Sequence, residues 1–221
     1  MVEHPIRNVT VYCSSSSRLH TSYLNVARDF GALLASSGRT LVYGGGGLGM
    51  MGACARSCRE AGGHVVGIIT ERLRDAEQMD PNNHENIVVG TMRERKALLE
   101  SRADAVVVLP GGVGTLEEFF EVFVGRLVGE HDKPVILVNT PDPTSGGGFY
   151  DPLQDMLEHV IASGFAKADI RDLLDICSTP DEVIDVLSNY EHAPESRNVG
   201  DRRRFMPGLQ DDADAERIGP T

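Results

Sequence analysis

The chain has 221 residues, of which 41% are hydrophobic and 24% charged, so it can bury a full core and fits one α/β domain with a tail. Its formal net charge of -12 repels polyanions over most of the surface, which argues against a nucleic acid as partner. No apolar run reaches the roughly 18 residues of a membrane span, and the start of the chain does not resemble a signal peptide. We therefore expect a cytoplasmic protein that binds neither membrane nor nucleic acid.

Short β-branched runs alternate with segments of helical period along the chain. Continuous apolar strands of this kind are typical of a parallel sheet that is covered by helices on both faces. The sequence predicts an α/β fold, a doubly wound parallel sheet in a single Rossmann-like domain over residues 1–190. The expected strands are 8–13, 40–44, 64–69, 86–90, 104–110 and 133–139; the expected helices lie between the first two strands and at 50–61, 92–102, 115–128, 152–163 and 180–189.

Two further segments have a simple expected structure. Residues 191–221 are polar and strongly charged, which predicts a disordered tail, with a docking peptide as the alternative. Cys54 and Cys58 lie four residues apart on a predicted helix, but no second pair at comparable spacing accompanies them. We expect two buried thiols there, and neither a disulfide framework nor a metal site in the chain.

Ligands of an open parallel sheet bind where the strands end, because all carboxyl ends share one edge. Five segments follow predicted strands and should line that edge: 14–17, 44–52, 70–78, 91–96 and 110–118. In the second of these, Gly44, Gly46 and Gly49 have the spacing G-x-G-x-x-G, and Glu71 follows about twenty residues later, as in a dinucleotide-binding fingerprint. The same run is equally typical of a tight turn between strand and helix.

The segment 109–121, LPGGVGTLEEFFE, carries a stronger signal. Its glycines allow close backbone approach, and free N–H groups at the start of a helix favour an anion. A Walker loop would require a lysine that this segment lacks, so a monophosphate is the expected ligand. Glu118 is expected in the first helical turn, where the helix dipole keeps it ionised, while Glu117 points about 100° away.

A group of cations, Arg93, Arg95 and Lys96, lies at the start of the preceding predicted helix. A helix N-terminus does not favour positive charge, so their placement indicates a bound anion. A solvated helix end is the alternative.

Two separated motifs resemble those of one known family. PGGVGTLEE at 110–118 matches P-G-G-x-G-T-x-x-E, and Met92, Arg95 and Lys96 match the companion motif M-x-x-R-K. By these motifs the chain is similar to the Lonely Guy family, cytokinin riboside 5'-monophosphate phosphoribohydrolases long mislabelled lysine decarboxylases. The resemblance runs from Val11 to Leu187.

The resemblance implies a Rossmann-like homodimer that needs no cofactor. Such a protein would hydrolyse the N-glycosidic bond of a purine nucleoside 5'-monophosphate, a cytokinin nucleotide or AMP, to free base and ribose 5-phosphate. Carried over by position, Arg95 and Glu118 would be the catalytic pair, and an ionised carboxylate suits a sugar that becomes cationic. The residues implied to bind substrate are Ser15, Gly45, Gly46, Glu77, Met92, Lys96, Gly111, Gly112, Gly114 and Thr115.

Three other functions remain open from the sequence. A non-catalytic nucleotide-binding or molybdenum-cofactor carrier protein of the same fold would use the same loops, but it would leave Arg95 and Glu118 without a role. A nicotinamide oxidoreductase rests on the glycine spacing alone. A pyridoxal-dependent decarboxylase needs a Schiff-base lysine in a pocket, and the chain has only Lys96, Lys133 and Lys167.

Overall fold

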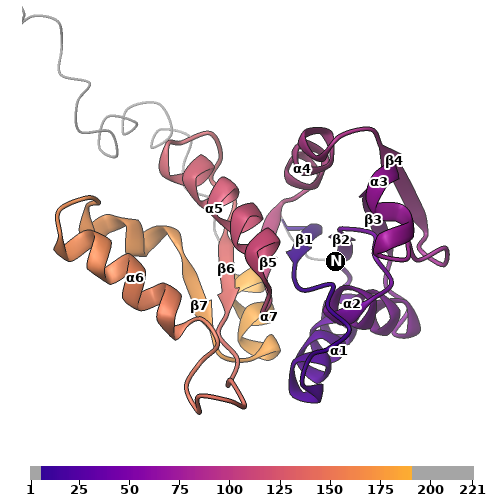
Figure 1. Cartoon of the computed structure of the whole chain (residues 1–221), viewed down its shortest axis with the longest axis horizontal. Coiled ribbons are helices and arrows are strands. Elements are labelled where there is room, and N and C mark those ends of the chain that lie inside the picture. Colours follow the sequence, from indigo (N-terminus) through magenta and orange to yellow (C-terminus); the bar gives the residue numbers. More distant parts are fainter. Residues whose placement is uncertain (1–5, 191–221) are drawn as a thin grey trace, which may run out of the picture.

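Seven parallel strands form one twisted sheet through the middle of the protein (Figure 1). The computed structural model describes residues 6–190. The strands run in the order β4-β3-β2-β1-β5-β6-β7, and every neighbouring pair is parallel. They are β1 (Asn8–Tyr12), β2 (Thr40–Tyr43), β3 (Val65–Thr70), β4 (Glu85–Val89), β5 (Ala105–Val108), β6 (Val135–Val138) and β7 (Asp175–Cys177).

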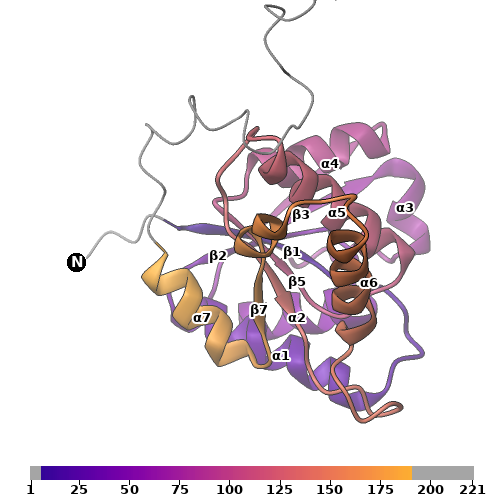
Figure 2. The same cartoon turned by 90° about the vertical axis from the view of Figure 1, so that its left-hand side faces the viewer.

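Helices cover both faces of the sheet, which confirms the doubly wound α/β prediction (Figure 2). One core lies under α1, α2 and α7, and a second lies under α4, α5 and α6. Alternate side chains of a strand enter different cores: Val11 of β1 joins the first and Tyr12 joins the second. The helices are α1 (Thr21–Ser36), α2 (Gly49–Glu60), α3 (Glu71–Ala76), α4 (Met92–Ser101), α5 (Val113–Leu127), α6 (Asp151–Ala162) and α7 (Pro180–Asn189), with a 3-10 helix η1 (Ala168–Leu173).

Local signals in the sequence explain several element ends. Gly38 has a φ of 75° just after α1, a left-handed conformation that favours glycine. Thr179 accepts a hydrogen bond from the backbone N–H of Glu182 at the start of α7, and Pro180 occupies the first helical position. The prediction that Cys54 and Cys58 are buried is confirmed, since both thiols lie in the core under α1 and α2.

Three elements were not expected from the sequence: α3, η1 and β7. None of the residues of α3 is buried, so the helix has no apolar period to read. Strand β7 has only three residues, and Ile176 at its centre is 45% exposed at the edge of the sheet. Helix α5 begins at Val113, two residues earlier than expected. The predicted tail lies outside the described residues.

The order of the strands marks one place where a ligand is expected. The chain passes from β1 outward to β4 on one side and from β5 outward to β7 on the other, so β1 and β5 form the switch point of the sheet. Crevices at the carboxyl ends of such strands are the usual ligand sites of open α/β sheets. Among the described residues, no helix combines the length and the apolar character that a membrane crossing requires.

Candidate active site

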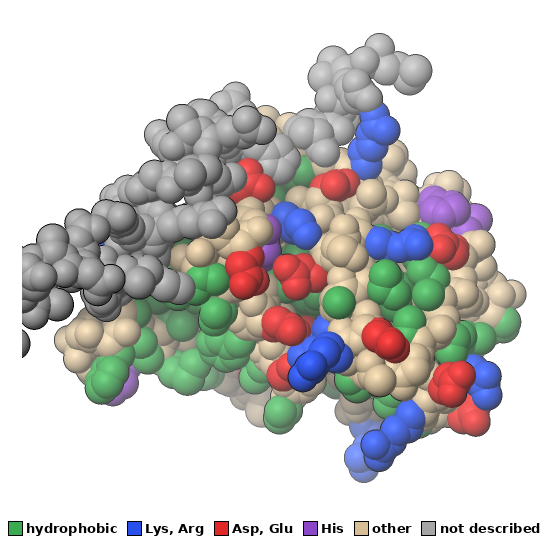
Figure 3. All heavy atoms as spheres, turned by 90° about the horizontal axis from the view of Figure 1, so that it is seen from above, with side chains coloured by type: hydrophobic (Ala, Val, Ile, Leu, Met, Phe, Trp, Pro, Cys, Tyr) green, Lys and Arg blue, Asp and Glu red, His purple; other side chains and the backbone are tan. Residues whose placement is uncertain are grey.

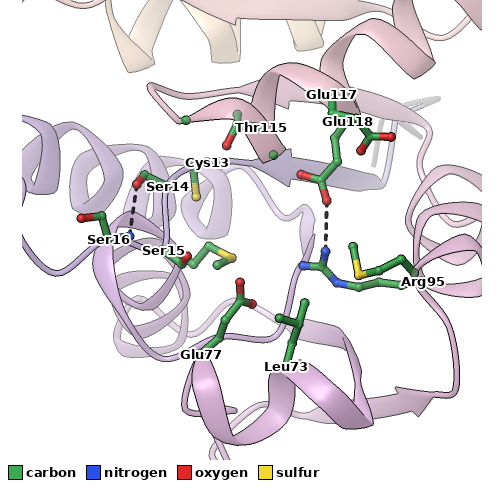
Figure 4. A pocket seen from close by; sticks show the side chains of 14 residues that line it. Cys13, Ser14, Ser15, Ser16, Leu73, Glu77, Arg95, Thr115, Glu117 and Glu118 are labelled. Atoms are coloured by element: carbon green, nitrogen blue, oxygen red, sulfur yellow. Dashed lines mark hydrogen bonds and ion pairs between the residues drawn. The ribbon is translucent and has the colours of Figure 1, made fainter.

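A cavity of about 330 Å³ opens at the carboxyl ends of β1 and β5 (Figure 4). The loop after β1, the end of α3, the start of α4 and the start of α5 supply most of its walls. Its lining residues are Cys13, Ser14, Ser15, Ser16, Met51, Leu73, Glu77, Met92, Arg95, Gly112, Gly114, Thr115, Glu117 and Glu118.

The start of α5 is suited to an anion. Gly112 is the N-cap residue, and no side chain caps the first turn of this helix. Its leading N–H groups therefore face the cavity without an intrahelical partner. The start of α2 differs, because the backbone N–H groups of Met50 and Met51 donate to the carbonyl oxygen of Ser14 at 2.9 and 3.3 Å. The start of α5 therefore offers amides to a ligand, whereas two amides at the start of α2 are already bound by Ser14.

Arg95 is the cation among the lining residues, and several contacts hold its side chain. Its side chain comes from the first turn of α4 and is 5% exposed. Nε donates to the carbonyl oxygen of Ile68 at 3.0 Å, Nη2 donates to that of Gly44 at 3.3 Å, and Nη1 donates to Oε1 of Glu118 at 3.1 Å. One carbonyl group within β3, one just after β2 and one carboxylate thus fix the plane of the guanidinium.

The sequence predicts that Glu118 lies in the first turn of its helix. In the structure α5 starts at Val113, so Glu118 lies in the second turn. Its side chain is only 12% exposed. Burial raises the pKa of Glu118 to about 7, although the nearby Arg95 guanidinium lowers it. The expectation that the helix dipole keeps this carboxylate firmly ionised is therefore wrong: removal from water outweighs the favourable charge. A carboxyl group with this pKa can gain or lose a proton near neutral pH.

The other cations at the start of α4 find partners on the protein. Nζ of Lys96 forms ion pairs with Glu117 and, at 3.0 Å, with Glu121, and this lysine does not line the cavity. Glu117 borders the cavity but turns away from Glu118 in Figure 4 and is 54% exposed. Arg93 is exposed. Because acids of α5 neutralise Arg95 and Lys96, the placement of these cations does not require a bound anion.

A second carboxylate, Glu77, reaches into the cavity opposite Glu118 (Figure 4). It directly follows α3. Its Oε2 atom is buried and has no hydrogen-bond partner among the described residues. Burial raises the pKa of Glu77, while Arg95 and a hydrogen bond from Ser15 lower it. An unpartnered buried oxygen that faces a cavity is a candidate ligand contact.

The glycine run does not build a dinucleotide site. Gly45 and Gly46 are absent from the cavity lining, and Glu71 is an exposed residue at the start of α3. The loop instead contacts the chain that follows α3: the backbone N–H of Gly47 lies 2.8 Å from the carbonyl oxygen of Gln78. The tight-turn interpretation fits these contacts.

The structure brings most of the predicted site residues together. Those that line the cavity are Ser15, Glu77, Met92, Arg95, Gly112, Gly114, Thr115 and Glu118; those that do not are Gly45, Gly46, Lys96 and Gly111. Gly111 lies under Thr115, where a Cβ atom would come within 2.1 Å of the threonine hydroxyl oxygen. Six lining residues are outside the predicted set of site residues: Cys13, Ser14, Ser16, Met51, Leu73 and Glu117. Their only signal is that they lie within or beside the strand-end segments.

The fold and this cavity define a Rossmann-like α/β protein with a candidate active site at its switch point. A family model described as "Possible lysine decarboxylase" matches residues 51–187. The chain belongs to this family, the Lonely Guy family. A Mycobacterium tuberculosis protein named cytokinin riboside 5'-monophosphate phosphoribohydrolase is 42% identical over 159 residues, covering 72% of this chain and 81% of that protein. An Oryza sativa subsp. japonica relative of the same name is 38% identical, over 86% of this chain and 75% of its own.

Solved structures show the same fold. The X-ray structure of TM1055 superposes with a TM-score of 0.62 at 26% identity, covering 84% of this chain and 100% of that one. A molybdenum cofactor binding protein from Rippkaea orientalis gives a TM-score of 0.61 at 22% identity, over 85% of this chain and 97% of its own. At that identity the likeness concerns the fold alone.

Proposed function

We propose that this protein hydrolyses the N-glycosidic bond of a purine nucleoside 5'-monophosphate and releases free base and ribose 5-phosphate. One observation carries the proposal: the Arg95–Glu118 pair, joined at 3.1 Å, shares a cavity with the uncapped start of α5. A phosphate group and a reacting sugar therefore have adjacent places to bind. The names of the relatives support the same activity.

The polar end of the cavity suits the phosphate. Gly112, Gly114 and Thr115 at the start of α5 would supply N–H groups and a hydroxyl, with the loop 14–16 on the facing side. The side chains of Met51, Leu73 and Met92 also border the cavity and offer an apolar surface to a purine ring. The sugar would then lie between them, beside Glu118 and Glu77. Binding energy from the phosphate would hold the reacting carbon in place.

In the chemical step, the bond between the anomeric carbon and the base nitrogen breaks, and its electron pair leaves with the base. Positive charge develops on the sugar, where the carboxylate of Glu118 stabilises it. Water supplies the new oxygen on the anomeric carbon and loses one proton to Glu118. The departing base takes up one proton from solvent, and Glu118 returns its proton to solvent, so that the carboxylate is regenerated. Arg95 would orient Glu118 and the sugar hydroxyl groups through its fixed guanidinium.

The alternatives fit the cavity less well. A carrier of the molybdenum cofactor has the fold in its favour but gives the Arg95–Glu118 pair no task. A pyridoxal-dependent decarboxylase needs a lysine in the pocket, and none of the three lysines of the chain is among the lining residues.

We also propose a homodimer that acts in the cytoplasm. Exposed apolar side chains on β4, α4 and α5 support the dimer: Val88 is 41% exposed, Met92 44% and Val124 46%. Four free, buried thiols are consistent with a reducing compartment.

A panel of purine monophosphates tests the activity. The purified protein should release adenine from AMP, or N6-isopentenyladenine from the corresponding cytokinin nucleotide, as measured by chromatography. The matching nucleosides, which lack the phosphate, should react far more slowly because the start of α5 then binds nothing. If no purine monophosphate yields free base, this function is wrong, and a ligand that co-purifies with the protein would favour the carrier.

A further inference from the structure

The glycine-rich loop 44–47 forms backbone hydrogen bonds with another part of the chain, the segment 77–80 between α3 and β4. The backbone N–H of Gly47 lies 3.1 and 2.8 Å from the carbonyl oxygens of Glu77 and Gln78, and the N–H of Asp80 donates to the carbonyl oxygen of Gly45 at 3.0 Å. Gly46 and Met79 form an isolated antiparallel bridge. Backbone groups that could hold a ligand are thus bound to the residues next to Glu77.

This contact requires the glycines. A Cβ atom on Gly47 would lie 2.7 Å from the carbonyl oxygen of Gln78, and one on Gly46 would lie 3.2 Å from both Cβ and the carbonyl oxygen of Glu77. Gln78 itself has a φ of 48°, a conformation that costs free energy in a residue other than glycine. Contacts around it must therefore hold the segment in this shape.

A buried ion pair provides such contacts. Nη2 of Arg59 in α2 lies 2.8 Å from Oδ2 of Asp80, which is 6% exposed. Nη1 of Arg59 donates to Oδ1 of Asn83 at 2.8 Å, and Nδ2 of Asn83 lies 3.0 Å from the hydroxyl of Tyr43. The pair and its amide neighbour bind the middle and the end of the α3–β4 connection to α2 and β2.

Apart from a hydrogen bond from Ser15 to its carboxylate and one from its backbone N–H to the carbonyl oxygen of Leu73, few contacts hold Glu77 in place. Helix α3, which precedes it, buries none of its residues. Segments with few buried contacts open readily, so the position of Glu77 depends on the contacts made by residues 78–80. The carboxylate must nevertheless stay in the cavity, where its Oε2 atom lies buried without a partner.

We infer that Arg59 and Asp80 are positioning residues that, together with the loop 44–47, hold the carboxylate of Glu77 in the active-site cavity. Neither residue lines the cavity, so each acts through Glu77. The glycine-rich loop 44–47 therefore binds the backbone of the segment 77–80. The kinetic part of this inference rests on the proposed function, whereas its structural part does not.

Kinetics of Asp80→Asn, Glu77→Gln and the double variant test the inference. Asp80→Asn breaks the ion pair at nearly constant shape and should lower kcat/KM for base release about tenfold or more, since small misplacements of catalytic groups are costly. The double variant should be about as slow as Glu77→Gln alone, because Asp80 has no effect once the carboxylate is gone. Arg59→Lys, which keeps the charge, should be faster than Arg59→Met. Losses that multiply in the double variant would overturn the inference.

A titration that needs no turnover gives the second test. In protein with 13C-labelled glutamate, the pKa of Glu77 should be raised in the unaltered chain and should move toward the ordinary glutamate value in Asp80→Asn. Glu85→Gln is the matched control, because Glu85 forms an exposed ion pair with Arg102 at 3.0 Å and does not touch the segment 77–80. An unchanged Glu77 titration in folded Asp80→Asn rejects the inference, even if the unaltered protein proves to release no base.

Gly47→Ala is the second variant in case Asp80→Asn does not fold. The new methyl group would push against Gln78, whereas Gly90→Ala adds one at ordinary contact distance, 3.4 Å from Glu94, and serves as its control. Gly47→Ala should shift the Glu77 titration and Gly90→Ala should not. If both Asp80→Asn and Gly47→Ala fail to fold, the segment is needed for stability itself and the positioning role is wrong.

Discussion

Glu117 and Glu118 are neighbours in the chain, yet they lie in different environments. Glu118 is 12% exposed and binds Arg95, whereas Glu117 is 54% exposed and binds Lys96. Successive residues of a helix point about 100° apart, which separates the two carboxylates. Only Glu118 combines burial, a fixed cation and direct access to the space beside a sugar. The role of Glu118 can therefore be tested by replacing its carboxylate with the amide of glutamine, which has nearly the same shape.

Glu118→Gln should lower kcat for base release by about a hundredfold or more, because a neutral amide neither stabilises the cationic sugar nor accepts a proton from water. The rate is measured with AMP or the best substrate of the panel, and circular dichroism checks the fold. Glu121→Gln is the control: this residue also lies on α5, is 44% exposed and pairs with Lys96. It should change the rate less than about threefold, as expected of an exposed ion pair. Equal losses in both variants would contradict the assignment.

The pH dependence of the reaction follows from the same residue. Burial raises the pKa of Glu118 to about 7, and the chemistry needs the ionised form. A rising pH removes the proton, so kcat/KM should climb with a slope of one up to about pH 7 and level off above it. The profile is measured from pH 5 to 9, with a check that the protein stays folded at each end. A rate that falls as pH rises through 7 would mean that the protonated carboxyl is the active form.

At the level of elements, the sequence predicts the structure of a segment best where residues close together in the chain determine that structure. The segment 110–118 combines a strand end, glycines and a helix start, and it forms one wall of the cavity as expected. The glycine run 44–47 looks much the same in sequence, but its backbone groups form hydrogen bonds with the segment 77–80 and do not line the cavity. This contact joins segments about thirty residues apart and depends on the packing of α3 and β4. A pattern of neighbouring residues in the sequence cannot predict such packing. The partners of Lys96 were missed for a similar reason, because Glu117 and Glu121 lie on another helix.

Two glycines at the start of α5 should respond differently to the same change. Gly111→Ala would place Cβ 2.1 Å from the hydroxyl oxygen of Thr115, so it should lower the free energy of unfolding by about 1–3 kcal/mol. Gly112→Ala has nothing within 4 Å of the new atom and should keep the stability. Because Gly112 lines the cavity, its variant should raise KM for the monophosphate instead. Thermal unfolding and steady-state kinetics separate the two effects; equal melting temperatures for both variants would contradict the proposed packing.

On the scale of the whole molecule, the net charge of the protein disfavours a nucleic acid as partner, whereas its exposed apolar side chains favour a second protein chain. A net charge of -12 disfavours polyanions, so a phosphorylated substrate depends on the local N–H groups of α5. Figure 3 looks onto the side that carries α4 and α5, where apolar side chains lie between acidic and basic ones. A mixed surface of this kind suits a second protein chain better than a nucleic acid.

The proposed homodimer can be tested on that side of the molecule. Sedimentation equilibrium should give a mass of twice 23.9 kDa for the unaltered chain. Val124→Asp places a charge on α5 where the side chain is 46% exposed, so it should leave the fold intact and yield monomers, because a buried unpaired charge destabilises an interface. Phe165→Ser is the control, since this side chain is 87% exposed and follows α6. Its variant should remain a dimer; a monomeric unaltered chain, or a Val124→Asp variant that still dimerises, would exclude an interface centred on α5.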